Sequence, residues 1–276
     1  LTGIVPIAGQ RLDFNLPYPD CLLPIAPNYT LIEAAIVECA YAGCDTIWVV
    51  CNDDIAPVVR HTVGDYIEDP MYFYNTKTRT SDTRRRIPIF WVPIHPKDRD
   101  KRDCLSWSVL HGALSALKVS SQISKWTIPD KYYVSFPYGY FDPDQIWKSR
   151  KKIKSTKNFY LSSNDKTVQD NLYISFTFGK EEFIKYRRNV RKGTGVYTTE
   201  VLDDRGIPRS KLPLEERWSA RFFELSQVFT DLDLETSNVL QVEYKNIGKW
   251  SEYIDFMASD VVKNIKRPPE QLYSYK

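Results

Sequence analysis

Apolar and polar positions along the first fifty residues predict a strand, a helix and a second strand. Residues 3–8 form a short apolar run typical of a strand. Residues 31–41 follow a helical pattern, with Thr30 placed as the N-cap and Gly43 placed to end the helix. Residues 46–51 are continuously apolar and β-branched, as in a strand buried on both faces of a parallel sheet. This order predicts a βαβ unit.

The same alternation continues to the end of the chain. Further helices are expected over 55–67, 106–117, 181–190, 214–229 and 250–258 and from Pro143, and further strands over 87–94, 132–136 and 239–244. No internal repeat or long linker divides them, so residues 1–276 are predicted to form one α/β domain with insertions. The expected fold has three layers, in which helices flank a mostly parallel sheet containing Ile4, Ile47, Ile89, Tyr133 and Val242.

Composition and charge narrow the class of protein. The chain has 276 residues, of which 42% are hydrophobic, so it can bury a sizeable core and is not expected to be disordered or fibrous. Its formal net charge of +3 gives no reason to expect nucleic acid or a membrane as a partner. The longest apolar run, near residues 47–51, is too short to span a membrane. Five cysteines without a C-x-x-C pair fit a reducing compartment, so a cytoplasmic location is expected.

Three blocks of sequence carry motifs in a fixed order. Residues 4–25 read I-V-P-I-A-G-Q-R-L-D-F-N-L-P-Y-P-D-C-L-L-P-I, residues 131–144 read K-Y-Y-V-S-F-P-Y-G-Y-F-D-P-D, and residues 242–257 read V-E-Y-K-N-I-G-K-W-S-E-Y-I-D-F-M. Together they span nearly the whole chain and resemble the sugar-1-phosphate nucleotidylyltransferases, which join a nucleoside triphosphate to a sugar phosphate and release pyrophosphate. The resemblance implies a divergent member with the Rossmann-like nucleotidyltransferase fold, of the GT-A type.

The resemblance also implies where a nucleotide would bind. The candidate nucleotide-binding residues are Ala8, Gly9, Gln10 and Arg11 in the loop after the first strand, then Asp20 and Gly112. Enzymes of this family neutralise the phosphates with loop N–H groups, a lysine and a Mg²⁺ ion held by two aspartates. In this chain Asp20 stands in the place of the lysine, and Tyr138 and Asn246 stand in the places of the aspartates. Because these side chains cannot supply that chemistry, no residue is predicted to be catalytic and no cofactor is expected.

In two alternative interpretations of the sequence, the chain is an active enzyme. Asp142 and Asp144, in the string D-P-D, are candidate ligands for Mg²⁺ in a divergent nucleotidylyltransferase, or in a glycosyltransferase whose D-x-D motif they match. The other interpretation is that they are the cap and the first-turn acid of the helix that begins at Pro143. Residues 52–54 offer two more carboxylates at the end of a strand, again with a helix cap as the other interpretation.

The function predicted from these residues is that of a pseudoenzyme, a nucleotidyltransferase-like protein with an eroded catalytic site that serves as a binding, regulatory or assembly subunit. Its candidate partners are a nucleotide or sugar nucleotide, and another protein or a second copy of the chain. Residues 71–86 and 214–229, which are rich in aromatic and arginine side chains, are the candidate protein interface. The basic run 185–192 is interpreted as a solvated helix face, with phosphate binding by Lys185, Arg188 and Lys192 as the alternative.

Overall fold

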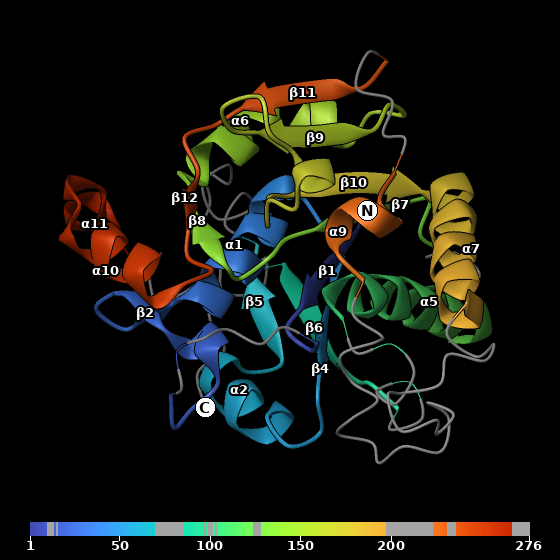
Figure 1. The fold of residues 1–276 in the computed structure, drawn as a ribbon, viewed down its shortest axis with the longest axis horizontal. Helices are drawn as coiled ribbons and strands as arrows, with labels where there is room; N and C mark the ends of the chain where they lie inside the picture. The colour runs from blue at the N-terminus through green and yellow to red at the C-terminus, as the bar shows by residue number, and fades with distance from the viewer. Residues whose placement is uncertain are drawn as a thin grey trace, which may run out of the picture.

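A sheet of eight strands forms the centre of the structure, a computed structural model that describes residues 1–9, 14, 16–69, 85–95, 98, 102, 104–123, 128–196, 223–230 and 236–266 (Figure 1). Its strands, in spatial order, are β11 (Asn238–Gln241), β9 (Phe159–Ser162), β10 (Phe176–Gly179), β7 (Lys131–Val134), β1 (Thr2–Pro6), β4 (Thr46–Cys51), β6 (Arg86–Pro93) and β5 (Tyr66–Glu68). Strands β7, β1, β4 and β6 are parallel neighbours, and β11 is parallel to β9, whereas β10 and β5 run antiparallel to their neighbours. The predicted mostly parallel sheet is therefore confirmed.

Helices cover both faces of the sheet. The described helices are α1 (Leu31–Ala42), α2 (Ala56–Val63), α5 (Leu105–Ile123), α6 (Asp144–Ile153), α7 (Lys180–Val196), α9 (Leu225–Val228), α10 (Trp250–Ala258) and α11 (Asp260–Asn264). α1 and α6 pack on one face, and α5, with α7 and α9 beside it, packs on the other (Figure 1). Two small sheets pair β2 (Pro24–Ala26) with β3 (Tyr29–Thr30), and β8 (Gly139–Tyr140) with β12 (Lys245–Asn246). Within the described residues, no helix combines the length and apolar character needed to cross a membrane.

The side chains of β1 and β4 point alternately into two separate cores. Val5, Ile47 and Val49 pack on the α1 face of the sheet, whereas Ile4 and Val50 pack on the α5 face, and all five are fully buried. Because both faces of these central strands are covered, the sequence of β4 shows no polar alternation. The helices on each face of the sheet therefore bury the apolar side chains that β1 and β4 direct to that face.

Local sequence signals set the two ends of α1 as predicted. The Thr30 hydroxyl oxygen accepts the Glu33 N–H at 3.5 Å, and the Glu33 carboxylate accepts the Thr30 N–H at 2.9 Å, which completes a capping box. At the other end Gly43 takes a left-handed conformation with φ 86°. Both signals act between near neighbours in the chain, so the helix bounds follow from local sequence.

The helix expected over 55–67 is shorter in the structure. α2 ends at Val63, because Gly64 leaves the helical conformation with φ 91° and ψ −168°. Ile67 then lies in β5, antiparallel to β6. The predicted helix runs through this glycine, the residue type that most often ends a helix.

Two predictions near the C-terminal end also differ from the structure. The strand expected over 239–244 begins at Asn238 and ends at Gln241, so Val242 follows β11 rather than lying in it, because the chain leaves the sheet there toward β12. Of the helix expected over 214–229, the described part is the short α9, which begins after Glu224 in an extended backbone conformation. Residues 214–222 lie outside the described residues.

Candidate functional site

The structure brings together the three sequence blocks that carry the resemblance. The second and third blocks pair through β8 and β12, and the Ile247 N–H donates to the Tyr138 carbonyl oxygen at 2.8 Å. The third block also reaches the first, because the Tyr253 hydroxyl of α10 donates to the Pro24 carbonyl oxygen at 2.8 Å. β2, β8, β12 and α10 accordingly lie together toward the left of Figure 1. Segments from both ends and the middle of the chain therefore meet at one place.

The loop after β1 lies against the start of α5, at the carboxyl edge of the parallel strands. The Ser108 hydroxyl donates to the Ala8 carbonyl oxygen at 2.7 Å. Gly9 has φ 81°, and a β-carbon on it would lie 2.6 to 2.7 Å from backbone atoms of Cys104, so no larger residue fits. Ala8 and Gly9 are therefore placed where open α/β sheets bind ligands. Gln10 and Arg11 lie outside the described residues.

Asp20 and Tyr138, which stand in the places of a family lysine and a family aspartate, lie close to each other. Tyr138 is 2% exposed, and burial together with the nearby Cys21, Tyr173 and Asp20 raises its pKa well above the ordinary value. Burial and the charge of Asp20 raise the pKa of the Cys21 thiol to about 12. Each of these groups favours the neutral form of its neighbours, whereas a phosphate would require a cation here.

Aromatic rings occupy the place in which the resemblance puts the first metal ligand. The ring centroids of Tyr138 and Tyr173 are 5.4 Å apart, and those of Phe136 and Tyr173 are 6.1 Å apart. Phe136 and Tyr138 are both buried. A phenol with a raised pKa stays protonated at neutral pH, so Tyr138 offers no anionic oxygen to a metal ion.

Asn246, in the place of the second aspartate, pairs with Gly139, directly after Tyr138. Its amide nitrogen donates to Glu252 Oε2 at 2.9 Å, and the same carboxylate oxygen accepts the N–H groups of Gly248 and Lys249 at 2.9 and 3.0 Å. The carboxylate of Glu252 therefore holds the loop before α10. Asn246 Oδ1 is buried and has no hydrogen-bond donor among the described residues, but one neutral oxygen is far short of the octahedral set of oxygen ligands that Mg²⁺ prefers.

The carboxylates of the enzyme alternatives act as helix-start groups. Asp142 and Asp144 are both exposed, and Asp142 Oδ1 accepts the Asp144 N–H at 3.1 Å. Asp54 Oδ1 likewise accepts the Ile55 N–H at 3.1 Å, just before α2. In the part of the chain that the structure describes, no three His, Cys, Asp or Glu side chains come together where they could hold a metal ion. The residues present therefore do not fit the Mg²⁺ ion that the resemblance implies.

Gly112 lies where α5 packs against the sheet. A β-carbon at this position would be 2.8 Å from Val50 Cγ2 and 3.0 Å from Ile4 Cγ2. The glycine thus lets the helix approach β1 and β4 closely. Its predicted role in nucleotide binding stays a prediction, and the structure adds a packing role.

Sequence reasoning missed Glu38, a buried carboxyl group on α1. The Tyr133 hydroxyl donates to Glu38 Oε1 at 2.6 Å, and the Ser135 hydroxyl donates to Oε2 at 2.7 Å. Burial raises the pKa of Glu38 to about 7, although hydrogen bonds from Ser175, Tyr133 and Ser135 lower it. Glu38 also lines a small cavity of about 20 Å³ beside β8. A glutamate within an otherwise apolar helical stretch is the signal that could have identified it.

Glu38 is expected to make the stability of the protein depend on pH. Its pKa is about 7 in the folded chain against an ordinary value of 4.5, so between these pH values the unfolded chain loses a proton that the folded chain keeps. The free energy of unfolding then falls as the pH rises through this window, by about 3 kcal/mol in total. We expect urea titrations to show this loss between pH 4.5 and pH 8 in the wild-type protein and not in the Glu38→Gln variant. The same pH dependence in both proteins would contradict the assignment.

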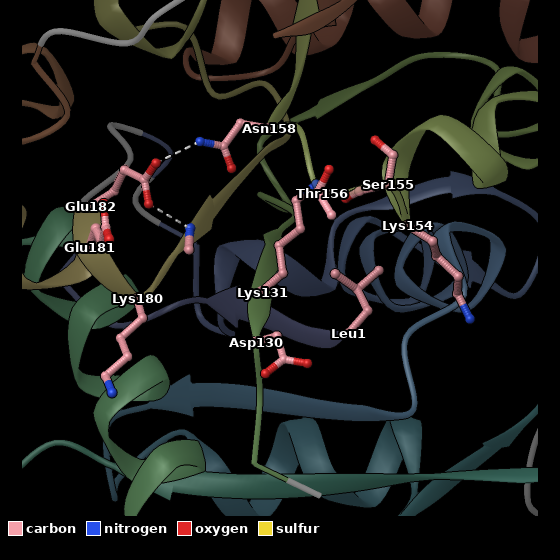
Figure 2. A pocket seen from close by; sticks show the side chains of 11 residues that line it. Leu1, Asp130, Lys131, Lys154, Ser155, Thr156, Asn158, Lys180, Glu181 and Glu182 are labelled. Carbon is pink, nitrogen blue, oxygen red and sulfur yellow. Dashed lines mark hydrogen bonds between the residues drawn. The ribbon is translucent and has the colours of Figure 1, made fainter. Parts of the chain in front are cut away.

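A larger cavity of about 540 Å³ lies at the opposite edge of the sheet, near the first residues of β1 and β7. Figure 2 shows the Glu182 carboxylate on its wall, which accepts the Asn158 amide N–H at 2.8 Å and the Gly179 N–H at 3.0 Å. Lys131 Nζ donates to backbone carbonyl oxygens at the end of α6, and burial lowers the pKa of Lys131 to about 8. These polar groups bond to the protein itself, and the cavity is remote from Gly9.

Most of the candidate protein interface lies outside the described residues, which omit 70–84 and 214–222. Of the remainder, Phe223 and Phe229 are buried in the core beside α5. Arg86 begins β6, and its guanidinium carbon lies 4.5 Å from the centroid of the Tyr66 ring. The interface itself stays a prediction.

Comparison with solved structures gives the class of fold. The chain matches a Bacillus anthracis protein, assigned as a glucose-1-phosphate thymidylyltransferase and solved with sucrose bound, at 10% identity and a TM-score of 0.53, over 97% of this chain and 98% of that chain. A nucleoside-diphosphate-sugar pyrophosphorylase from Vibrio cholerae RC9 matches at 14% identity and a TM-score of 0.49, over 93% of this chain and 100% of that chain. No protein-family model and no curated protein sequence matches the chain.

The protein therefore has the nucleotidyltransferase-like α/β fold. This assignment follows from the match to the Bacillus anthracis protein. At 10% identity, that match concerns the fold and not the activity. The resemblance to the sugar-1-phosphate nucleotidylyltransferases, inferred from three sequence blocks, is thus supported at the level of the fold.

Proposed function

We propose that this nucleotidyltransferase-like protein lacks pyrophosphorylase activity and serves as a binding, regulatory or assembly subunit. The observation that carries the proposal is Tyr138, a buried phenol in the place where the resemblance puts a metal-binding aspartate. Nucleotidyl transfer requires charge neutralisation on the triphosphate, which Mg²⁺ supplies when it is bound. Neither Tyr138 nor Asn246 offers an anionic oxygen at neutral pH, and Asp20 adds a negative charge near Tyr138.

A nucleotide or sugar nucleotide is the small ligand we propose, held without a metal ion. Ala8 and Gly9 support this, since they keep a tight loop at the carboxyl edge of the parallel strands. The matched Bacillus anthracis protein is named for thymidylyl transfer to a sugar phosphate, a chemistry that uses ligands of the same class. The protein partner we propose is either another chain or a second copy of this one.

Nucleotide binding with and without a metal ion tests the proposal. The full chain is titrated calorimetrically with nucleoside triphosphates and with nucleoside-diphosphate sugars, once with Mg²⁺ and once with EDTA. We expect the dissociation constant to differ by less than about twofold between the two conditions. An affinity that rises about tenfold or more with Mg²⁺ would refute the loss of the metal site.

The variants Asp142→Asn and Asp144→Asn serve as controls for the enzyme alternative. If binding depends on Mg²⁺ and either substitution removes that dependence, the D-P-D string holds the metal ion. If binding does not depend on Mg²⁺, we expect both variants to bind as the wild-type chain does.

A further inference from the structure

Three arginine side chains gather where α7 packs against the start of α5. Arg102 stands just before α5, and Arg187 and Arg191 are about one turn apart on α7. The Arg102 side chain is 19% exposed, and its guanidinium carbon lies 4.0 Å from the centroid of the Trp107 ring. The guanidinium carbon of Arg187 lies 5.5 Å from the centroid of the Phe183 ring. These ring contacts hold two of the charged groups in place.

The positive charges of this arginine cluster repel one another. Burial lowers the pKa of Arg187, and the charges of Arg191 and Arg102 lower it further. Among the described residues, Asp98 is the carboxylate that pairs with the cluster, with 3.2 Å between its Oδ1 and Arg102 Nη2. Within that same part of the chain, Arg187 and Arg191 have no carboxylate at ion-pair distance. Counted over the described side chains alone, three cations and one anion leave an excess of two positive charges.

Two buried N–H donors at the cluster have no acceptor among the described residues. They are Arg102 Nε and Trp107 Nε1, and Trp107 is 5% exposed. Leaving a buried donor unsatisfied is unfavourable, and the great majority of such groups in folded proteins have a partner. Unsatisfied donors beside an excess of positive charge are the arrangement that an oxyanion completes.

We propose that Arg102, Arg187 and Arg191 form a binding site for a phosphoryl group of a small molecule. A phosphate dianion matches the excess charge, and its oxygens match the forked N–H donors of a guanidinium group. The site adjoins the loop after β1, because Cys104, two residues after Arg102, lies against Gly9. None of the residues on which the proposed function rests, Tyr138, Ala8 and Gly9, belongs to the cluster, so the site goes beyond the proposed function and does not depend on it.

Arg188 provides a matched control for the arginine cluster. It carries the same charge on the same helix, but it follows the exposed Ile184 by one turn, whereas Arg187 follows the buried Phe183 by one turn. A diffuse attraction of anions to α7 would involve Arg188 as much as its neighbours, whereas a defined site would not.

Calorimetric titration of the full chain with pyrophosphate, in EDTA, tests the site. We expect saturable binding that Arg187→Gln or Arg191→Gln weakens at least about tenfold and that Arg188→Gln weakens less than about twofold. Equal weakening by all three substitutions would mean general surface charge and would overturn the proposal. Absence of pyrophosphate binding to the wild-type chain would also overturn it.

Thermal unfolding separates ligand binding from folding. Without ligand, Arg187→Gln is expected to change the Tm little, because the relief of repulsion offsets the lost contact with the Phe183 ring, and a large fall in the Tm would give the arginine a structural role and contradict the site. Pyrophosphate should raise the Tm of the wild-type chain and of Arg188→Gln, but not that of Arg187→Gln.

Titration with a nucleoside diphosphate shows whether the bound phosphoryl group belongs to a nucleotide. Affinity equal to that of pyrophosphate supports recognition of the phosphoryl groups alone, and tighter binding supports a nucleotide as the carrier.

Discussion

Mixed with a nucleoside triphosphate, Mg²⁺ and a hexose 1-phosphate, the protein is expected to release no pyrophosphate above the uncatalysed background. Asp20 puts an anion where the resemblance places a phosphate-binding cation, and Tyr138 and Asn246 replace two anionic metal ligands. Losing that cation and the metal ion together removes on the order of 8 kcal/mol of transition-state stabilisation, which is about six decades in rate. A coupled assay for pyrophosphate measures this directly.

A contradicting result of that assay would be easy to recognise. Turnover that requires Mg²⁺ and reaches about 1 per second, an ordinary enzyme rate, would show that the chain has kept a metal site. Asp142→Asn and Asp144→Asn would then decide whether the D-P-D string supplies it. Unchanged turnover in both variants would point to other carboxylates, such as Asp53 and Asp54.

Replacing Tyr138 by aspartate, the residue type that the resemblance places there, is expected to destabilise the protein rather than to restore a metal site. The substitution removes a ring that packs 5.4 Å from the Tyr173 ring, and truncating a buried aromatic side chain costs about 3 to 5 kcal/mol. It also buries a carboxylate close to Asp20 and Cys21, which adds a desolvation cost. We expect the free energy of unfolding, measured by urea titration, to fall by about 4 kcal/mol or more.

Tyr138→Phe is the matched control, because it keeps the ring and removes the hydroxyl. We expect its free energy of unfolding to stay within about 1.5 kcal/mol of the wild-type value. A Tyr138→Asp variant as stable as the wild-type chain, with new affinity for Mg²⁺, would contradict the view that aromatic packing has replaced the metal site.

Elements defined by near neighbours could be predicted from the sequence. Thr30 and Gly43 set the ends of α1 through hydrogen bonds within a few residues, and the apolar run of β4 reflects its burial between two helical layers. The resemblance of three blocks gave the fold class, and the structure brings those blocks together. The end of α2 could also be predicted from the sequence, because Gly64 directly follows its last residue.

Groups that meet only through tertiary packing could not be predicted in this way. Glu38 is buried by Tyr133 and Ser135, which lie on and just after a strand far along the chain. Arg102 comes close to Arg187 because α7 packs on α5, and no local pattern records that contact. Tyr186, within the basic run 185–192, is 1% exposed, because it lies on the buried face of α7 with Phe183 and Val190.

The central position of β1 determines when the chain can complete its sheet during synthesis. Thr2 pairs with Thr46 of β4 on one side and with Tyr132 of β7 on the other. After β4 has left the ribosome, β1 therefore keeps an unpaired edge until β7 is made, which at about 5 to 20 residues per second takes roughly 4 to 20 s. An open strand edge can pair with other chains, so the nascent protein is exposed to aggregation during this interval.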